Sequence, residues 1–103
     1  MNPTYDEILK ANSMRGEDIK KTPLIYSPVF SEITGSKIYL KAEFRQRTGS
    51  FKIRGAYYKI KSLSDEEKKH GVVAASAGNH AQGMAFASSL EKIPCTIVMP
   101  KHA

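Results

Sequence analysis

Hydrophobic and polar positions follow two different periods between residues 37 and 63. Over residues 37–43, isoleucine, leucine and alanine alternate with tyrosine, lysine and glutamate, and this period of two predicts a strand with one buried face. After a turn at residues 48–49 the spacing lengthens to three and four, which is typical of an amphipathic helix with apolar positions at Ile53, Ala56, Tyr57, Ile60 and Leu63. We therefore expect a strand, a turn and then a helix that Lys52 opens.

The second half of the chain has the pattern of a strand, a helix and another strand. An apolar, β-branched run at residues 72–76 precedes a helix of small residues at 80–90, and a second strand-like run follows at 96–99. Strands joined by a helical crossover of this length pair in parallel. The predicted fold class is therefore α/β, with a parallel βαβ unit. Parallel sheets are covered on both faces, and the chain ends directly after the second strand, so we expect an incomplete three-layer sheet.

Capping signals predict two further helices. The segments TYDE at residues 4–7 and SDEE at 64–67 have the form of a capping box. A short helix is expected after each, the first over residues 5–13 and the second ending near Gly71. Pro23 imposes extended backbone on the residue before it.

The composition is that of a globular protein. Apolar residues make up 41% of the 103 residues and charged residues 25%, and no apolar run is long enough to cross a bilayer. The first residues lack a basic segment followed by an apolar core, so we expect no secretory signal, no membrane partner and a cytoplasmic location.

Neither the cysteine nor the histidines suggest a reactive or metal site. Cys95, the single cysteine, lies in the apolar run CTIVM and is expected to pack as a small hydrophobe. His70, His80 and His102 lack neighbouring cysteines and do not share a helical face. No metal is therefore predicted.

The net charge of +6 is concentrated in one stretch. Between Lys41 and Lys61 there are seven basic residues and one acidic residue, Glu43. Such a cluster attracts anions, either nucleic acid, a phosphorylated cofactor or a carboxylate substrate, although a solvated basic face remains an alternative. Because the cluster lacks interleaved exposed aromatic residues, we expect no nucleic-acid partner.

The segment SAGNHAQG, residues 76–83, lies at the expected strand-to-helix junction. In an open α/β sheet ligands bind at such junctions, because free N–H groups and the helix dipole favour an anion there. Asn79, His80 and Gln82 add side-chain donors. From the pattern alone, a turn whose polar residues only cap the helix stays open as an alternative.

Lys52 is also open to two interpretations, a reactive amine or an ordinary surface lysine. A lysine in the first helical turn is disfavoured by the helix dipole. The same positive end, together with Arg54, favours an uncharged amine, and a neutral amine is the form that attacks an aldehyde. An ordinary surface lysine remains the alternative.

Two of these motifs together resemble a known family. SFKIRGA at residues 50–56, preceded by Thr-Gly and followed about twenty residues later by SAGNHAQG, is similar to the serine/threonine dehydratases, pyridoxal-phosphate enzymes of fold type II. The resemblance implies that Lys52 is the Schiff-base lysine, that Phe51 packs against the ring of pyridoxal 5'-phosphate and that Asn79 hydrogen-bonds the ring hydroxyl. It also implies that the substrate carboxylate is received by a loop made of Ser76, Ala77, Gly78, Asn79 and His80.

Ile53 indicates that the chain resembles the dehydratase branch of this fold type, which includes serine racemase. Threonine synthase and cysteine synthase usually carry an aspartate at this position. Residues 47–56 look most like catabolic threonine dehydratases. The resemblance implies that the intact enzyme, expected to be a homo-oligomer, converts L-threonine to 2-oxobutanoate and ammonia by β-elimination, or acts on L-serine. Lys52 would remove the Cα proton. A serine racemase-like enzyme and a non-catalytic basic anion-binding remnant stay open as alternatives.

The chain departs from the family pattern at two dipeptides and in length. Phe44-Arg45 replaces an Asp or Asn followed by Leu or Met, and Glu91-Lys92 replaces Leu-Gly, which removes the glycine favoured after a helix. The resemblance implies that the family's phosphate-binding loop would lie beyond Ala103. The resemblance therefore implies an N-terminal fragment, inactive by itself, with the start of the large domain at about residues 1–52 and of the small domain at about 53–103.

Overall fold

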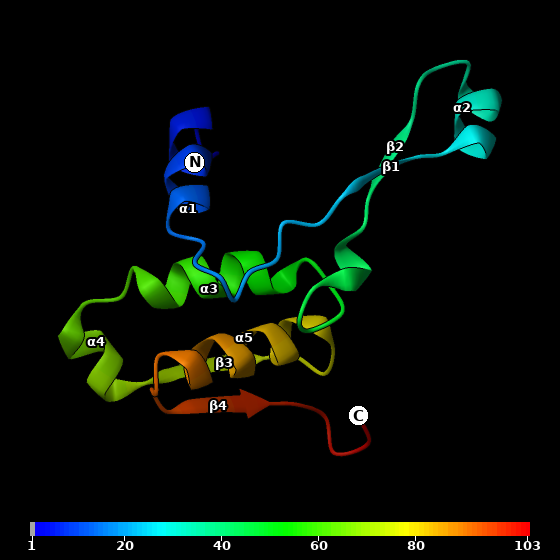
Figure 1. Cartoon of the computed structure of the whole chain (residues 1–103). Helices are drawn as coiled ribbons and strands as arrows, with labels where there is room; N and C mark the ends of the chain where they lie inside the picture. The colour runs from blue at the N-terminus through cyan, green and yellow to red at the C-terminus, as the bar shows by residue number, and fades with distance from the viewer. Residues whose placement is uncertain (1) are drawn as a thin grey trace.

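Two helices packed side by side on a parallel strand pair form the body of the molecule. The computed structural model describes residues 2–103, and it places α3 (Lys52–Lys61) next to α5 (Asn79–Leu90) (Figure 1). The strands β3 (Val72–Ala75) and β4 (Cys95–Val98) both contact α5. This confirms the predicted strand, helix, strand order of the second half, with boundaries within one residue of those expected.

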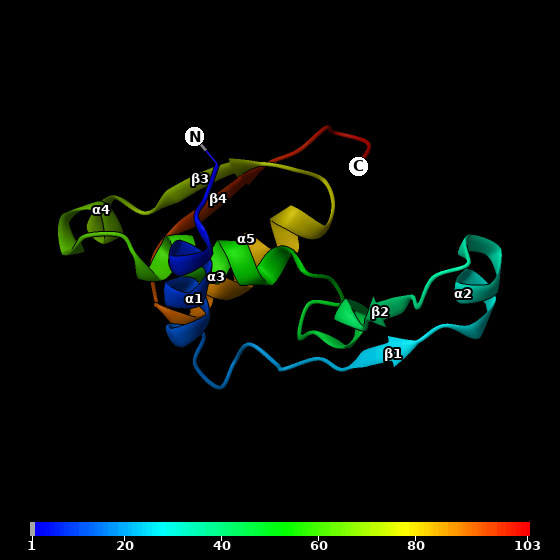
Figure 2. The same ribbon diagram turned by 90° about the horizontal axis from the view of Figure 1, so that it is seen from above.

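The two strands pair in parallel, as predicted. Val72 aligns with Cys95 and Ala75 with Val98. Along both strands the exposure alternates, so that one face packs on the helices and the other does not. Figure 2 shows α3 and α5 on one face of the strand pair. The incomplete layering expected from the sequence is therefore present among residues 2–103, where nothing covers Val73, which is 73% exposed.

Both predicted capping boxes form. In α1 (Tyr5–Ser13) the Thr4 hydroxyl accepts the Glu7 N–H, and the Glu7 carboxylate accepts the Thr4 N–H. The same reciprocal pair, formed by the residues at 64 and 67, opens α4 (Asp65–His70). Local hydrogen bonding therefore fixes the start of each helix.

A hairpin-like arm extends away from the body (Figure 1). It contains β1 (Leu24–Tyr26), the short helix α2 (Pro28–Thr34) and β2 (Tyr39–Lys41), and the two strands pair antiparallel. The helix α2 was not predicted, although Ser27, which caps it, and Pro28 at its first position are both typical start signals.

The expected strand at residues 37–43 is shorter than predicted, and the prediction of one buried face is wrong. Only Tyr39–Lys41 is strand, and all three residues are exposed, because β2 pairs with β1 in the arm and lies over no core. Glu43 instead begins a 3-10 turn, η1 (Glu43–Arg45). Of the expected apolar face, only Ala42 is fully buried.

The apolar core lies where α3 meets α5. The residues buried in it come mainly from the predicted face of α3, and they are Ile19, Ile53, Ala56, Tyr57, Ile60, Met84 and Ala87. Cys95 is half-buried and packs against this core, as expected for a small hydrophobe. Burial of this face accounts for most of the stability available to α3, since helix propensity alone is weak over ten residues.

The molecule exposes more surface than a compact chain of its size. Its accessible surface is 7607 Å² for a mass of 11.4 kDa, against roughly 5,800 Å² expected for a compact monomer. Its radius of gyration is 16.3 Å, where a compact fold of this length would have about 13 Å. The excess comes from the arm and from the bare face of the strand pair.

The Glu91-Lys92 dipeptide, where the resemblance implies Leu-Gly, has a visible structural consequence. Lys92 adopts a left-handed backbone with φ of 55°, a conformation that glycine occupies more easily. Glu91 ends α5 and pairs with Lys61 at 2.7 Å and Lys68 at 3.2 Å, so it links α3, α4 and α5. The dipeptide thus introduces backbone strain and an ion-pair link together.

We predict that Lys92→Gly stabilises the chain by about 1 kcal/mol, because the left-handed conformation costs glycine no Cβ clash. The measurement is urea unfolding followed by far-UV circular dichroism. Lys59→Gly is the control, since Lys59 is an exposed lysine inside α3, and glycine in a helix interior costs about 1 kcal/mol. Equal destabilisation by both variants would contradict the prediction.

Candidate active site

Lys52 is the first residue of α3 and is exposed, as the sequence predicts. Its Nζ lies 5.2 Å from the centroid of the Phe51 ring, which is itself 59% exposed. The helix start has no side-chain cap and no acidic residue in its first turn. An amine and an aromatic ring are therefore presented together at a positively polarised helix end.

The loop at residues 76–80 leads from β3 into α5, also as predicted. The Ser76 hydroxyl accepts the N–H groups of Gly78 at 3.3 Å and Ala81 at 3.2 Å. Among residues 2–103, no group accepts the N–H of Ala77, Asn79 or His80, and the first turn of α5 contains no acidic residue. Ser76 thus fills part of the helix end, while three exposed N–H donors remain available to an anion.

The two helix starts lie at the same end of the body. The helices α3 and α5 run side by side in the same direction in both views (Figures 1 and 2). Gly83, one turn into α5, lies so close to α3 that a Cβ on it would stand 3.2 Å from the Ile53 nitrogen and 3.2 Å from the Lys52 carbonyl carbon. A glycine at this position therefore brings the backbone at Lys52 directly against the first turns of α5.

Arg54 does not act as the free positive charge that the sequence suggested. Its Nε donates to Glu43 Oε2 at 2.9 Å and its Nη2 donates to Glu43 Oε1 at 2.7 Å, a two-point ion pair. The Arg54 guanidinium, assisted by the Thr22 hydroxyl, lowers the pKa of Glu43 to about 2. The sequence-based expectation of a free Arg54 charge beside Lys52 is therefore wrong, because Glu43 pairs with the arginine.

This ion pair belongs to a network that sequence analysis missed. Arg54 Nη2 also donates to the Lys20 carbonyl oxygen at 3.2 Å. The Gln46 side chain makes two hydrogen bonds to the backbone of Lys20. Its Oε1 accepts the Lys20 N–H at 3.2 Å, and its Nε2 donates to the Lys20 carbonyl at 2.8 Å. The Thr22 hydroxyl donates to Glu43. The one signal available in the sequence was that Glu43 is the only acid in the basic stretch.

The basic stretch is not a single cationic face. Lys61 pairs with Glu91, Lys41 donates to the Thr22 carbonyl, and the guanidinium of Arg45 lies 5.7 Å from the Phe44 ring centroid. Arg45 stands where the resemblance implies Leu or Met, and it is exposed, so the charge replaces no buried apolar contact here. The charges are distributed over separate contacts, which does not favour a nucleic-acid surface.

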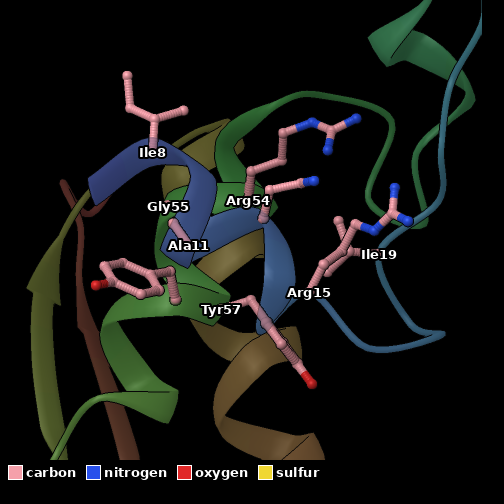
Figure 3. Close-up of a pocket in the computed structure, with 9 residues that line it drawn as sticks. Ile8, Ala11, Arg15, Ile19, Arg54, Gly55 and Tyr57 are labelled. Atoms are coloured by element: carbon pink, nitrogen blue, oxygen red, sulfur yellow. The ribbon is translucent and has the colours of Figure 1, made fainter. Parts of the chain in front are cut away.

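A cavity of about 250 Å³ lies elsewhere, between α1 and α3 (Figure 3). Its lining includes neither Lys52 nor any residue of the loop at 76–80, and it consists of Ile8, Ala11, Asn12, Arg15, Ile19, Arg54, Gly55, Tyr57 and Tyr58. Figure 3 shows Arg15 and Arg54 extending to the same side of it. Because its walls are mainly apolar and include neither Lys52 nor the loop at 76–80, it is distinct from the candidate active site.

Other kinds of site find no support in the described part of the chain. Over residues 2–103, no three His, Cys, Asp or Glu side chains come together as they would around a metal ion. Within the same residues, no helix has the length and apolar character needed to cross a membrane.

Comparison with known proteins matches these features to one family. Residues 16–103 match the family model described as pyridoxal-phosphate dependent enzyme. The chain belongs to this family. It is 58% identical to the L-threonine ammonia-lyase of Thermotoga maritima over 100 residues, which covers 97% of this chain and 25% of that protein.

Other pyridoxal-phosphate enzymes match the chain over nearly its whole length. The chain is 50% identical to the catabolic L-threonine dehydratase of Escherichia coli K12 over 98 residues, which is 95% of this chain and 30% of that protein. It superposes on the crystal structure of serine racemase from Dictyostelium discoideum with a TM-score of 0.89 and 40% identity, covering 97% of this chain and 33% of that one. The chain therefore has the α/β fold of these enzymes and spans about a quarter to a third of their length.

The residues at the shared helix end fit the cofactor that gives the family its name. Pyridoxal phosphate needs an amine for its aldehyde, and Lys52 supplies an exposed one. It needs an apolar contact for its ring, and the exposed ring of Phe51 lies next to that amine. The buried Ser50 hydroxyl, two residues before Lys52, has no hydrogen-bond partner among residues 2–103, so it too is a polar group left free beside the site.

We predict that Gly83→Ala and Gly55→Ala, both in helix interiors, change stability in opposite directions. At Gly55 nothing lies within 4 Å of an added Cβ, so alanine gains up to about 1 kcal/mol of helix propensity. At Gly83 the Cβ meets the backbone of Ile53 at 3.2 Å, and the strain outweighs that gain, with a net loss of about 1 kcal/mol. Urea unfolding of both variants is the measurement, and equal gains would show that the close approach carries no constraint.

We predict that Glu43→Gln weakens the chain by about 1–2 kcal/mol near neutral pH, because a part-buried two-point ion pair is lost. A carboxyl whose pKa is lowered to about 2 stabilises the fold above its unfolded pKa, and this contribution is lost as the pH falls toward 2. The stability difference between wild type and variant is therefore expected to narrow below about pH 4.5. Urea unfolding across this range measures it, and a difference that stays constant would contradict the assignment.

Proposed function

We propose that this chain carries the catalytic lysine of a pyridoxal-phosphate-dependent L-threonine or L-serine ammonia-lyase, which converts L-threonine to 2-oxobutanoate and ammonia. The observation that carries the proposal is the shared helix end, where the exposed Lys52 amine and three free N–H groups of the loop at 76–80 lie at one end of the α3–α5 pair. The identity of 58% to a named L-threonine ammonia-lyase supports the substrate class. The activity is proposed for a protein in which these residues are joined to the remaining length found in its relatives.

Lys52, Phe51 and Asn79 form the proposed cofactor contacts. Lys52 would hold the cofactor aldehyde through its Nζ. Phe51 would pack against the cofactor ring, and Asn79, the first residue of α5, would hydrogen-bond the ring hydroxyl. When bound, pyridoxal phosphate supplies an electron sink for the charge that develops when the Cα proton leaves.

The loop Ser76, Ala77, Gly78, Asn79 and His80 binds the substrate carboxylate in this proposal. Its support is the set of N–H donors that the chain leaves free, at the positive end of a twelve-residue helix. By fixing the carboxylate, the loop orients the Cα–H bond toward the amine. Lys52 Nζ would then take the Cα proton as a general base.

The proposal also covers the domain division, the cellular location and the oligomeric state. We place the start of the large domain at about residues 1–52 and of the small domain at about 53–103, in a cytoplasmic homo-oligomer. The projection of the arm, β1 to β2, away from the helical body supports a division near the start of α3. Against a sharp boundary, Ile19 packs in the same core as α3.

Racemisation of serine is the second candidate, favoured by the TM-score of 0.89 to a serine racemase. A racemase returns a proton to the face of Cα opposite the one from which it was taken, so it needs a second acid–base group facing Lys52 across the substrate. The two candidates differ in their products. Formation of D-serine from L-serine identifies the racemase, and 2-oxobutanoate from L-threonine identifies the ammonia-lyase.

We predict that pyridoxal phosphate, followed by borohydride reduction, labels Lys52 in preference to the other lysines of the chain. The reason is its position at a helix start beside an exposed aromatic ring. Peptide mapping by mass spectrometry measures the share of pyridoxyl label at each lysine, with Lys52→Ala as the control. Lys59, exposed on the same helix, is the internal comparison, and equal labelling of the two would remove the support for a specific site.

A further inference from the structure

The first turn of α3 lacks the usual means of fixing a helix start. Phe51 occupies the cap position with an apolar side chain, and no side chain accepts an N–H of the first turn. In α1 and α4 this role belongs to Thr4 and Ser64. An uncapped first turn tends to fray. If Lys52 is to present its amine in one place, contacts from outside the helix must hold this turn.

Successive residues of an α-helix lie about 100° apart around its axis, so Lys52, Ile53 and Arg54 point to three different sides. Lys52 is exposed, and Ile53 is fully buried in the core under Gly83. Arg54 points to the segments at residues 20–22 and 43–46 and donates to Glu43, Lys20 and Thr22. The side of the first turn turned away from Lys52 is therefore held by the arginine.

Glu43 is the centre of that attachment. It accepts both donors of Arg54 and the Thr22 hydroxyl, and its side chain is only 14% exposed. Without the carboxylate, Arg54 would keep only its contacts to the Lys20 carbonyl and the Thr22 hydroxyl, at 3.2 and 3.4 Å. The arginine would then have no ionic partner among residues 2–103.

We propose that Glu43 is a positioning residue for Lys52, acting through its two-point ion pair with Arg54 to hold the first turn of α3 and so the amine. This inference rests on the proposed function of Lys52. It adds that the geometry of the reactive lysine depends on a carboxylate nine residues before it, on the other side of the turn at residues 48–50. Glu43 touches neither cofactor nor substrate in this role.

The test compares Glu43→Gln with Glu91→Gln in the 103-residue chain. Glu91 is a matched control, because its side chain is 16% exposed and it also pairs with a basic residue of α3, but with Lys61 at the other end of the helix. The first readout is amide hydrogen exchange by NMR. In an α-helix the N–H groups of Ala56 and Tyr57 donate to the carbonyls of Lys52 and Ile53, so they report on the first turn.

Glu43→Gln is expected to speed exchange at Ala56 and Tyr57 by about tenfold relative to its effect on the last turn of α3. Glu91→Gln is expected to speed exchange at the last turn of α3 instead of the first. Exchange that rises uniformly along α3 in Glu43→Gln, or equally in both variants, would overturn the inference by showing a general loss of stability.

The second readout is the share of pyridoxyl label at Lys52 after borohydride reduction. It is expected to fall about threefold in Glu43→Gln and to stay at the wild-type value in Glu91→Gln. An unchanged share in Glu43→Gln overturns the inference. If wild type itself shows no preference for Lys52, the proposed function fails, while exchange at Ala56 and Tyr57 still decides whether Glu43 holds the turn.

If Glu43→Gln does not fold, Arg54→Lys replaces it in the hydrogen-exchange measurement. Lysine keeps the charge but offers a single donor point in place of the two-point fork. An increase in exchange at Ala56 smaller than tenfold but above that of Glu91→Gln supports the inference. Exchange at the wild-type rate contradicts it.

Discussion

The close contact between Gly83 and the backbone at Lys52–Ile53 is the constraint on which the rest of the structure depends. Side chains normally keep two helices 8–10 Å apart, but a glycine lets the first turns of α5 approach the backbone of α3 directly. This contact sets the relative position of two helix starts. One presents Lys52 and the other presents the free N–H groups at Ala77, Asn79 and His80. A larger residue at 83 would push apart the two ends that the candidate chemistry requires together.

Helix α3 carries both the core residues and the candidate catalytic lysine. The residues of α3 that build the core, Ile53, Tyr57 and Ile60, lie on the face toward α5 and Ile19. Lys52 lies outside that face, at the helix start. Because the core fixes the helix rotation about its own axis, it also fixes the direction in which the amine leaves the backbone. Packing substitutions in this core are therefore expected to affect the amine through its orientation as well as the fold through its stability.

Local features of the structure followed from the sequence, and features that depend on distant partners did not. Capping boxes and periodicity predicted α1, α3, α4 and the order β3, α5, β4 from signals within a few positions of one another. The parallel pairing of β3 with β4 followed from the length of the helical crossover between them. The buried face expected at residues 37–43 failed because β2 lies in the arm, away from the core. The pairing of Glu43 with Arg54 was missed because it joins a 3-10 turn to a helix through tertiary contact. The motif predicted the candidate site residues, but spacing alone could not reveal that Gly83 joins their helices.

The exposed apolar surfaces of the chain lie away from its candidate active site. The bare face of β3 and β4, with Val73 and Val98 exposed, lies on the side of the strands away from the helices, and the exposed apolar residues of the arm lie beyond η1. Neither lies between Lys52 and the loop at 76–80. The contacts that fix those two segments, Gly83 on α3, Ile53 in the core and Arg54 on Glu43, all lie within residues 19–97. Covering the exposed faces would therefore add stability to the strands and the arm, whereas the relation between the lysine and the N–H donors is set by contacts the chain already makes.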